Sequence, residues 1–222
     1  MMFGIDVFVI DPENEYKTLT QAIGGSYLSV SLNSDKRINP FDLPNLGADA
    51  DGEQNLRSAI ISLLGLMNLM LGELTPEEDA LMDRAIRETY ASRDITMDIK
   101  TQKNPAPTMG DLFNVLKNMQ GGESLAQRLD KYVTGTFAGI FNQPTNFDLE
   151  NGLVVFNIRD LEDQLRPIAM YIVLNYIWNR IRFNRKKRLL VIDEAWILMQ
   201  YEDSAKFLYS IAKRARKYWI GL

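Results

Sequence analysis

The sequence predicts an α/β fold, in which a parallel sheet with helices on both faces is interrupted by an all-helical insertion. Short apolar runs alternate with amphipathic stretches near both ends of the chain, and this order is typical of parallel sheets. The runs are continuously apolar, as expected for strands that contact water on neither face. Residues 53 to about 141 instead show only the apolar spacing of helices.

The first part of the sheet core is expected within residues 1–45. The stretch FGIDVFVIDP predicts a strand that ends at Pro12, because proline cannot donate a hydrogen bond to a neighbouring strand. EYKTLTQAIGG predicts a short helix closed by two glycines, and SYLSVSL alternates like an edge strand. NPFDLPNLGADADG then predicts a loop.

The helical insertion is expected over residues 46–145. Its clearest start signal is Thr75-Pro-Glu-Glu78, where threonine and glutamate can form a capping box around a proline in the first turn. Thr108 and Asp111 give a weaker version of that signal. Together with the apolar spacing, these signals predict helices over about residues 53–71, 76–90, 109–119 and 124–133. The methionines of this block are interpreted as core residues.

The second part of the sheet core is expected over residues 146–222. There the pattern returns to strands alternating with helices, namely GLVVFNI, residues 165–183, RLLVID, residues 204–218 and the beginning of a further strand in WIGL.

The composition narrows the chemistry that the chain can perform. It has 222 residues, 46% of them apolar, which is enough for a sizeable core. It contains no cysteine, which excludes disulfides, thiolate zinc sites and cysteine nucleophiles, and no histidine, which excludes imidazole-dependent triads. Any chemistry must therefore depend on carboxylates, cationic side chains, hydroxyls or an oxygen-ligated ion such as Mg²⁺.

The net charge of −4 conceals an uneven distribution. Residues 1–80 carry 13 acidic and 4 basic side chains, whereas residues 180–217 carry 11 basic and 4 acidic ones. The basic excess suits phosphates, nucleic acid or an acidic neighbouring surface, but a solvated helix face explains it as well. The N-terminus lacks the cationic leader of a signal peptide, and no apolar run reaches the roughly 18 residues of a membrane helix. We therefore expect a soluble or at most peripheral protein.

Two predicted strands end in acidic side chains. The first strand leads to Asp11, followed by Glu13 and Glu15, and RLLVID leads to Asp193 and Glu194. Ligands of open parallel sheets bind beyond the carboxyl ends of the strands. An aspartate that holds Mg²⁺, followed by a glutamate that polarises water, is the arrangement that ATP hydrolysis needs. The alternative is that Asp193 only caps the following helix.

Several segments of the chain together resemble a known family. FVIDPENEYKTL, INPFDLP, LVVFNIRDL, RLLVIDEAW and AKRARKYWIGL, in this order around a helical block, resemble the C-terminal ATPase domain of the type IV secretion and conjugative-transfer ATPases. This is the family of TraC, TrbE and the fourth VirB component, related to the HerA and FtsK pumping ATPases. The resemblance covers nearly the whole chain and implies a RecA-like P-loop NTPase core.

The resemblance also implies roles for individual residues. Asp193 corresponds to the magnesium-site aspartate of a Walker B strand, and Glu194 to the catalytic glutamate. Asp11 and Glu15 match the acidic turn near the nucleotide. The basic run matches family arginines that reach nucleotide phosphates, plausibly across a subunit boundary, and it comprises Lys213, Arg214, Arg216 and Lys217. Its alternative role is to complement the negative end of a helix.

The implied cofactors are ATP and Mg²⁺. The implied partners are further copies of the chain, in a hexamer, and the inner-membrane components of a type IV secretion system, with DNA as a further candidate. The implied location is the cytoplasmic face of the cell membrane.

One family element is missing from these residues: no glycine is followed by lysine, so the phosphate-binding loop GxxxxGK[ST] is not among them. In the family this loop precedes the first strand by one helix. We therefore expect the parent protein to be an ATPase and residues 1–222 alone to be inactive.

Three other interpretations remain open at this point. A double-stranded DNA translocase of the HerA or FtsK type would carry the same motifs. A non-catalytic interaction module would share the ancestry without the activity. A metal-dependent nuclease is suggested by the order Asp11, Glu15 and Lys17.

Overall fold

The computed structural model describes residues 4–47, 50–149, 152–181 and 186–222. The chain divides into two compact units. The first combines Met1–Lys36 with Asn146–Leu222 and contains the sheet, and the second is Arg37–Thr145 and is helical. Parts of three predicted elements lie outside the described residues. They are the start of the first predicted strand (residues 1–3), residues 48–49 of the predicted loop and residues 182–183 at the end of a predicted helix.

The first unit is built on a five-stranded sheet in which every described pair of neighbours is parallel. The strand order is β2-β3-β1-β4-β5. The strands are β1 (Asp6–Asp11), β2 (Ser26–Ser29), β3 (Leu153–Asn157), β4 (Arg188–Ile192) and β5 (Ile220–Gly221). The expected edge position of the SYLS segment and the short strand within WIGL are both confirmed.

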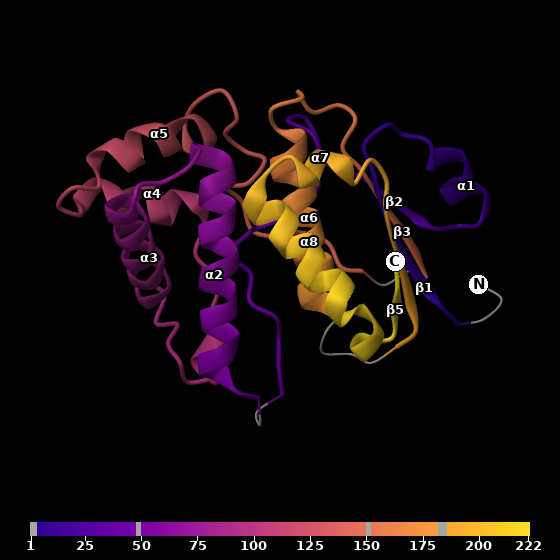
Figure 1. Cartoon of the computed structure of the whole chain (residues 1–222), viewed down its shortest axis with the longest axis horizontal. Helices are drawn as coiled ribbons and strands as arrows, with labels where there is room; N and C mark the ends of the chain where they lie inside the picture. Colours follow the sequence, from indigo (N-terminus) through magenta and orange to yellow (C-terminus); the bar gives the residue numbers. More distant parts are fainter. Residues whose placement is uncertain (1–3, 48–49, 150–151, 182–185) are drawn as a thin grey trace. The chain divides into compact units, whose positions relative to one another are not determined.

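The helices of this unit lie on both faces of the sheet (Figure 1). One face carries the short helix α1 (Lys17–Ala22). The other carries α6 (Arg166–Ile181), α7 (Trp196–Met199) and α8 (Glu202–Ala215). The helix expected over residues 204–218 ends as an α-helix at Ala215 and continues as the 3-10 turn η2 (Arg216–Tyr218).

The interpretation of RLLVID as a strand buried on both faces is wrong for one face. Val9, Leu153 and Val155 form a buried cluster on the face that carries α1, and Val191 packs against it only partly buried. Leu189 on β4 remains 40% exposed. The physical reason is that α1 has only six residues and lies over β2 and β3, so it does not reach β4.

The second unit is helical, as predicted. Its α-helices are α2 (Gly52–Leu71), α3 (Pro76–Ala91), α4 (Met109–Asn118) and α5 (Glu123–Val133), and η1 (Thr101–Lys103) is a 3-10 turn. The predicted capping box of α3 forms, with Glu78 N donating to Thr75 Oγ1 over 3.2 Å and Thr75 N to Glu78 Oε2 over 3.0 Å. Met67, Met82 and Met109 are fully buried, as expected for core residues, whereas Met97 is 59% exposed and does not fit that interpretation.

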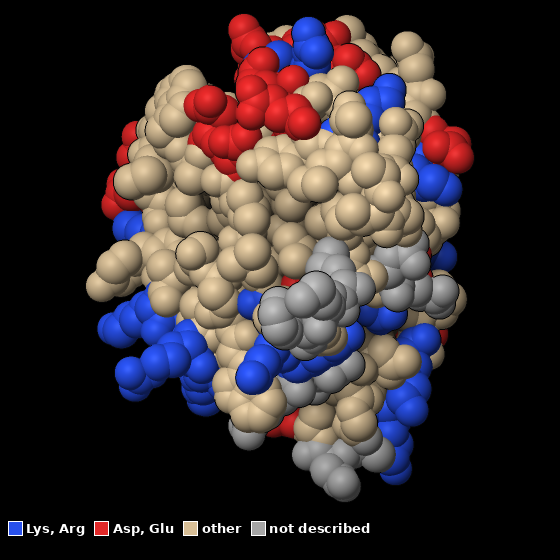
Figure 2. Space-filling model, turned by 90° about the vertical axis from the view of Figure 1, so that its right-hand side faces the viewer, with Lys and Arg blue, Asp and Glu red and all other residues tan. Residues whose placement is uncertain are grey.

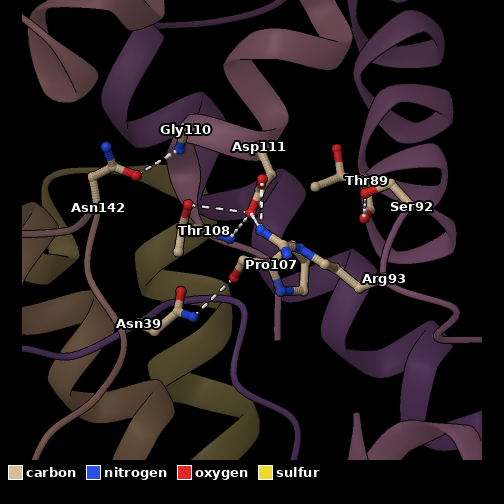
Figure 3. A network of polar contacts seen from close by, with 9 residues as sticks. All are labelled: Asn39, Thr89, Ser92, Arg93, Pro107, Thr108, Gly110, Asp111 and Asn142. Atoms are coloured by element: carbon tan, nitrogen blue, oxygen red, sulfur yellow. Dashed lines mark hydrogen bonds and ion pairs between the residues drawn. The ribbon is translucent and has the colours of Figure 1, made fainter. Parts of the chain in front are cut away.

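Polar contacts join the loops of the helical unit to the start of α4 (Figure 3). The Arg93 guanidinium donates to both oxygens of Asp111 over 2.9 Å, and the Thr108 amide donates to Asp111 Oδ2 over 2.8 Å. Burial by itself would raise the pKa of Asp111. The hydrogen bonds from Thr108 and Arg93 outweigh it and hold this pKa below its ordinary value. The Gly110 amide donates to Asn142 Oδ1 over 2.6 Å, so the segment that leaves α5 is held against α4.

Within the described ranges, none of the helices combines the length and the apolar character needed to cross a lipid bilayer.

Candidate functional site

The carboxyl edge of the sheet brings the two predicted acidic strand ends together. Ile10 and Ile192 are register partners on the neighbouring strands β1 and β4. One residue further on, the Asp193 amide donates to the Ile10 carbonyl oxygen over 3.1 Å. Asp11 and Asp193 therefore leave the same edge on adjacent strands, which is where parallel sheets place ligands.

Asp11 organises the turn that follows β1. Its side chain is fully buried. Its Oδ1 accepts the Glu15 amide over 3.0 Å and its Oδ2 accepts the Tyr16 amide over 3.1 Å. Asn14 adopts a left-handed conformation, φ 63°, which asparagine tolerates better than most residues. Both carboxylate oxygens of Asp11 are thus used to shape the backbone, and Glu15 is held exposed at the edge.

Asp193 and Glu194 occupy a strained turn between β4 and α7. Asp193 Oδ1 accepts the Glu194 amide over 3.0 Å, and no side-chain bond caps α7, so Asp193 is not the cap of that helix. Glu194 has φ 51°, a left-handed conformation that costs a non-glycine residue about 1 kcal/mol or more. The indole Nε1 of Trp196 donates a hydrogen bond to Glu194 Oε2.

Two tyrosines complete this edge and were not singled out from the sequence. Burial raises the pKa of Tyr16, and the nearby carboxylates of Asp193, Asp11 and Glu15 raise it further, so its hydroxyl stays protonated beside the acidic pair. The Tyr27 hydroxyl on β2 donates to Asn14 Oδ1 over 2.5 Å. Burial raises the pKa of Tyr27 as well, and the nearby Asp11 carboxylate raises it further.

Asn157 is a further polar residue that ends a buried strand at this edge. Its side chain is buried, hydrogen-bonds to Tyr27 and accepts the Arg159 amide over 3.1 Å. The signal that led to Asp11, a polar residue at the end of an apolar run, also applies to Asn157 in LVVFN and could have identified it.

Arg166 fixes the loops that follow β1 and β3 to one another. Its Nη1 lies 3.1 Å from Glu13 Oε1, and its Nη2 donates to the Arg159 carbonyl oxygen over 3.2 Å. Because Arg166 begins α6, the helix sets the position of both loops. The loop after Asp11 is therefore held by long-range contacts of Arg166 as well as by its own local hydrogen bonds.

The basic run is not brought to the acidic edge within one chain. Lys213 and Arg214 lie in the last turn of α8, and Arg216 and Lys217 lie in η2. The following β5 pairs with Arg188, the first residue of β4, so this run sits near the amino edge of the sheet. Figure 2 shows one face of the molecule, with acidic side chains gathered mainly at the top and basic ones mostly over the lower half.

A family model described as the TraG P-loop domain matches residues 1–221. The chain belongs to the TraG P-loop domain family. The structure of VirB4 from Thermoanaerobacter pseudethanolicus is similar over 97% of this chain and 85% of that one, with 28% sequence identity and a TM-score of 0.84. The predicted RecA-like P-loop NTPase fold and the predicted relationship to type IV secretion and conjugative-transfer ATPases are both confirmed.

A second solved structure shares less with this TraG P-loop domain. It is the plasmid coupling protein TrwB in complex with the non-hydrolysable ATP analogue ADPNP, with 13% identity and a TM-score of 0.39. The match covers 97% of this chain and 62% of that structure. No curated protein matches the chain.

The donor set at the carboxyl edge of this TraG P-loop domain fits a magnesium ion held through few protein ligands. Among the residues that the structure describes, no three acidic side chains lie close enough together to enclose a metal. Mg²⁺ is usually held by one or two carboxylates together with substrate phosphates and water, so a single carboxylate at this edge, such as that of Asp193, would be enough as a direct protein ligand.

The alternative of a nuclease loses its geometric basis. That interpretation needs Asp11 and Glu15 as metal ligands beside Lys17. Both oxygens of Asp11 instead accept backbone amides, and Lys17 Nζ lies 5.8 Å from the centre of the Tyr27 ring. The Asp11 carboxylate is thus engaged in folding the turn, whereas Glu15 takes part in it only through its backbone amide.

Proposed function

We propose that residues 1–222 are the part of an ATP-hydrolysing motor for type IV secretion or conjugative DNA transfer that carries the acidic pair of the nucleotide site. The observation that supports this most directly is the position of Asp193 and Glu194. They follow a sheet strand at the carboxyl edge, next to Asp11, in a chain of the TraG P-loop domain family. The phosphate-binding loop is supplied by residues outside 1–222.

Each acidic residue has its own role in this proposal. Asp193 holds the magnesium ion of Mg²⁺–ATP, and Glu194 orients and polarises the attacking water. Asp11 builds the turn that presents Glu15 toward the nucleotide. Mg²⁺ would supply part of the charge that neutralises the phosphates, so the acidic residues at this edge need only to hold the metal ion and to position the water.

The basic run acts in a neighbouring subunit. Arg214 and Arg216 lie at the opposite end of α8 from the acidic edge, and 14 helical residues span roughly 20 Å. They therefore reach the nucleotide of the next copy in a ring, which we propose to have six subunits. Guanidinium groups suit the charge that develops on a transferring phosphoryl group. Lys217 assists in binding the phosphates. The further partners are inner-membrane components of the secretion system, with DNA as a further candidate, at the cytoplasmic side of the membrane.

The experiment that tests this proposal compares Glu194→Gln with wild type in the ATPase that joins residues 1–222 to its phosphate-binding loop. Glu194→Gln should bind a fluorescent ATP analogue with unchanged affinity and hydrolyse ATP at least about 100-fold more slowly. Glu202→Gln on α8 is the matched control, because Glu202 is an exposed carboxylate that forms an ion pair with Lys206. Normal turnover in Glu194→Gln would remove Glu194 from this role.

A second experiment uses residues 1–222 alone. This chain should show negligible ATP turnover, because the backbone amides and the lysine that cradle the phosphates are not among its residues. Strong magnesium-dependent hydrolysis by this chain would contradict the proposal that the phosphate-binding loop lies elsewhere.

A further inference from the structure

Glu194 is held by a residue to which no role has been assigned so far. Its backbone is in the left-handed region, and its Oε2 accepts a hydrogen bond from the indole Nε1 of Trp196, two residues further along. A strained backbone persists only where surrounding contacts hold it, and such residues cluster at functional sites.

Packing alone does not explain the position of Trp196. The side chain is 57% exposed, so the ring is not placed there to fill the core. Trp196 is the first residue of α7, and the Glu194 carbonyl oxygen accepts the Ile197 amide over 2.9 Å. The turn from Glu194 to α7 is thus closed by one backbone bond and one side-chain bond, and the side-chain bond acts directly on the carboxylate.

We propose that Trp196 is a positioning residue for Glu194. This inference rests on the proposed function. The indole bond occupies one of the two carboxylate oxygens and fixes the rotation of the carboxyl group, so that Oε1 faces the water that attacks the nucleotide. A carboxylate that rotates freely would present a correctly aimed oxygen only part of the time, and the loss of alignment lowers the rate of the chemical step.

The bond itself can be tested in residues 1–222. The chain has three tryptophans, and therefore three indole N–H signals in a proton–nitrogen NMR spectrum. Trp196→Phe identifies one of them. Glu194→Ala should shift that signal upfield and leave the signal of Trp219 unchanged. Trp219 is the matched comparison because it is 56% exposed. An unmoved Trp196 signal would overturn the proposal.

The functional consequence is tested in the ATPase with its phosphate-binding loop. Trp196→Phe keeps the ring but removes the N–H donor, so kcat should fall about tenfold while KM for ATP stays within about twofold. Trp219→Phe should change neither. In a Glu194→Gln background, single-turnover measurements should show no further loss from Trp196→Phe, because the residue acts through Glu194.

The outcomes separate the two proposals. An unchanged kcat in Trp196→Phe, or an equal loss in both backgrounds, would overturn the positioning role while leaving the proposed ATPase intact. A large rise in KM with an unchanged kcat would also overturn it, and would indicate that Trp196 contacts the nucleotide or a neighbouring subunit. Normal hydrolysis by Glu194→Gln would contradict the proposed function, whatever the NMR experiment shows.

Discussion

Asp6 and Arg188 are register partners at the start of the neighbouring strands β1 and β4, with 3.7 Å between Asp6 Oδ2 and Arg188 Nε. Arg188 is buried, and burial lowers its pKa while the Asp6 carboxylate acts in the opposite direction. The pair lies at the amino edge, opposite the acidic site. It joins the starts of the two strands whose other ends lead to Asp11 and Asp193.

Asp6→Ala should lower the free energy of unfolding by about 2 kcal/mol, because the buried guanidinium of Arg188 loses a compensating charge. Urea denaturation of residues 1–222 measures this. Lys186→Ala is the control: Lys186 Nζ lies 2.6 Å from Asp6 Oδ1, but its side chain is 47% exposed, so the loss should stay below about 1 kcal/mol. Equal losses in the two variants would show that the burial of Arg188 does not determine the effect.

Asp11→Asn should destabilise the turn after β1. An asparagine has one acceptor oxygen, so one of the amides of Glu15 and Tyr16 would lose its partner and face an N–H₂ group. We expect a loss of about 1–3 kcal/mol in the free energy of unfolding and faster hydrogen exchange at these two amides. Glu13→Gln, on the exposed side of the same turn, should cost under about 1 kcal/mol. Slow exchange at both amides in Asp11→Asn would contradict the role given to Asp11.

Much of the fold follows from local signals in the sequence. The apolar run that ends at Asp11 predicts β1, because strands buried in a parallel sheet need continuous apolar residues. The run from Leu189 predicts β4 as a strand, although not its exposure on one face. Thr75 and Glu78 predict the start of α3 because a capping box is complete within four residues. The convergence of Asp11 and Asp193 could be predicted too, because parallel strands end at one edge.

The contacts that complete the site could not be predicted in this way. Tyr27 reaches Asn14 and Asn157 only because β3 lies between β2 and β1, and the strand order is not encoded in any local pattern. The exposure of Leu189 depends on how far α1 extends over the sheet. The contact of Trp196 with Glu194 requires the left-handed conformation of Glu194, which glutamate adopts rarely, so propensity argues against it.

The network around Asp111 predicts a pH dependence of stability in the helical unit. The pKa of Asp111 is held below its ordinary value, so the carboxylate contributes stability that is present above about pH 3.8 and is lost as the pH falls toward its folded-state pKa. Asp111→Asn should therefore cost about 1–2 kcal/mol at pH 7, and this difference from wild type should shrink below pH 4.

Denaturation curves at pH 7 and below pH 4 measure this difference. Asp83→Asn on α3 is the control, because Asp83 forms an ion pair with Arg87 on an exposed helix surface and should cost under about 0.5 kcal/mol. If the loss in Asp111→Asn were the same at both pH values, the bonds from Arg93 and Thr108 would not be the source of the effect.

The placement of the basic run predicts that its arginines act between subunits. In the ATPase with its phosphate-binding loop, Arg214→Ala or Arg216→Ala should lower ATP turnover more than ATP binding, because the charge they meet develops in the transition state. Lys213→Ala, on the same turn of α8, is the control and should have the smallest effect.

The decisive measurement mixes the impaired arginine variant with Glu194→Gln. Each variant alone turns over ATP slowly, but a mixed ring contains interfaces that join an intact glutamate to an intact arginine. Random mixing in equal amounts makes roughly a quarter of the interfaces complete, so activity should return to a corresponding fraction of wild type. If no activity returned while both proteins still assembled together, the arginine would have to act within its own subunit, which the position of η2 beside the amino edge of the sheet does not allow without a rearrangement of α8.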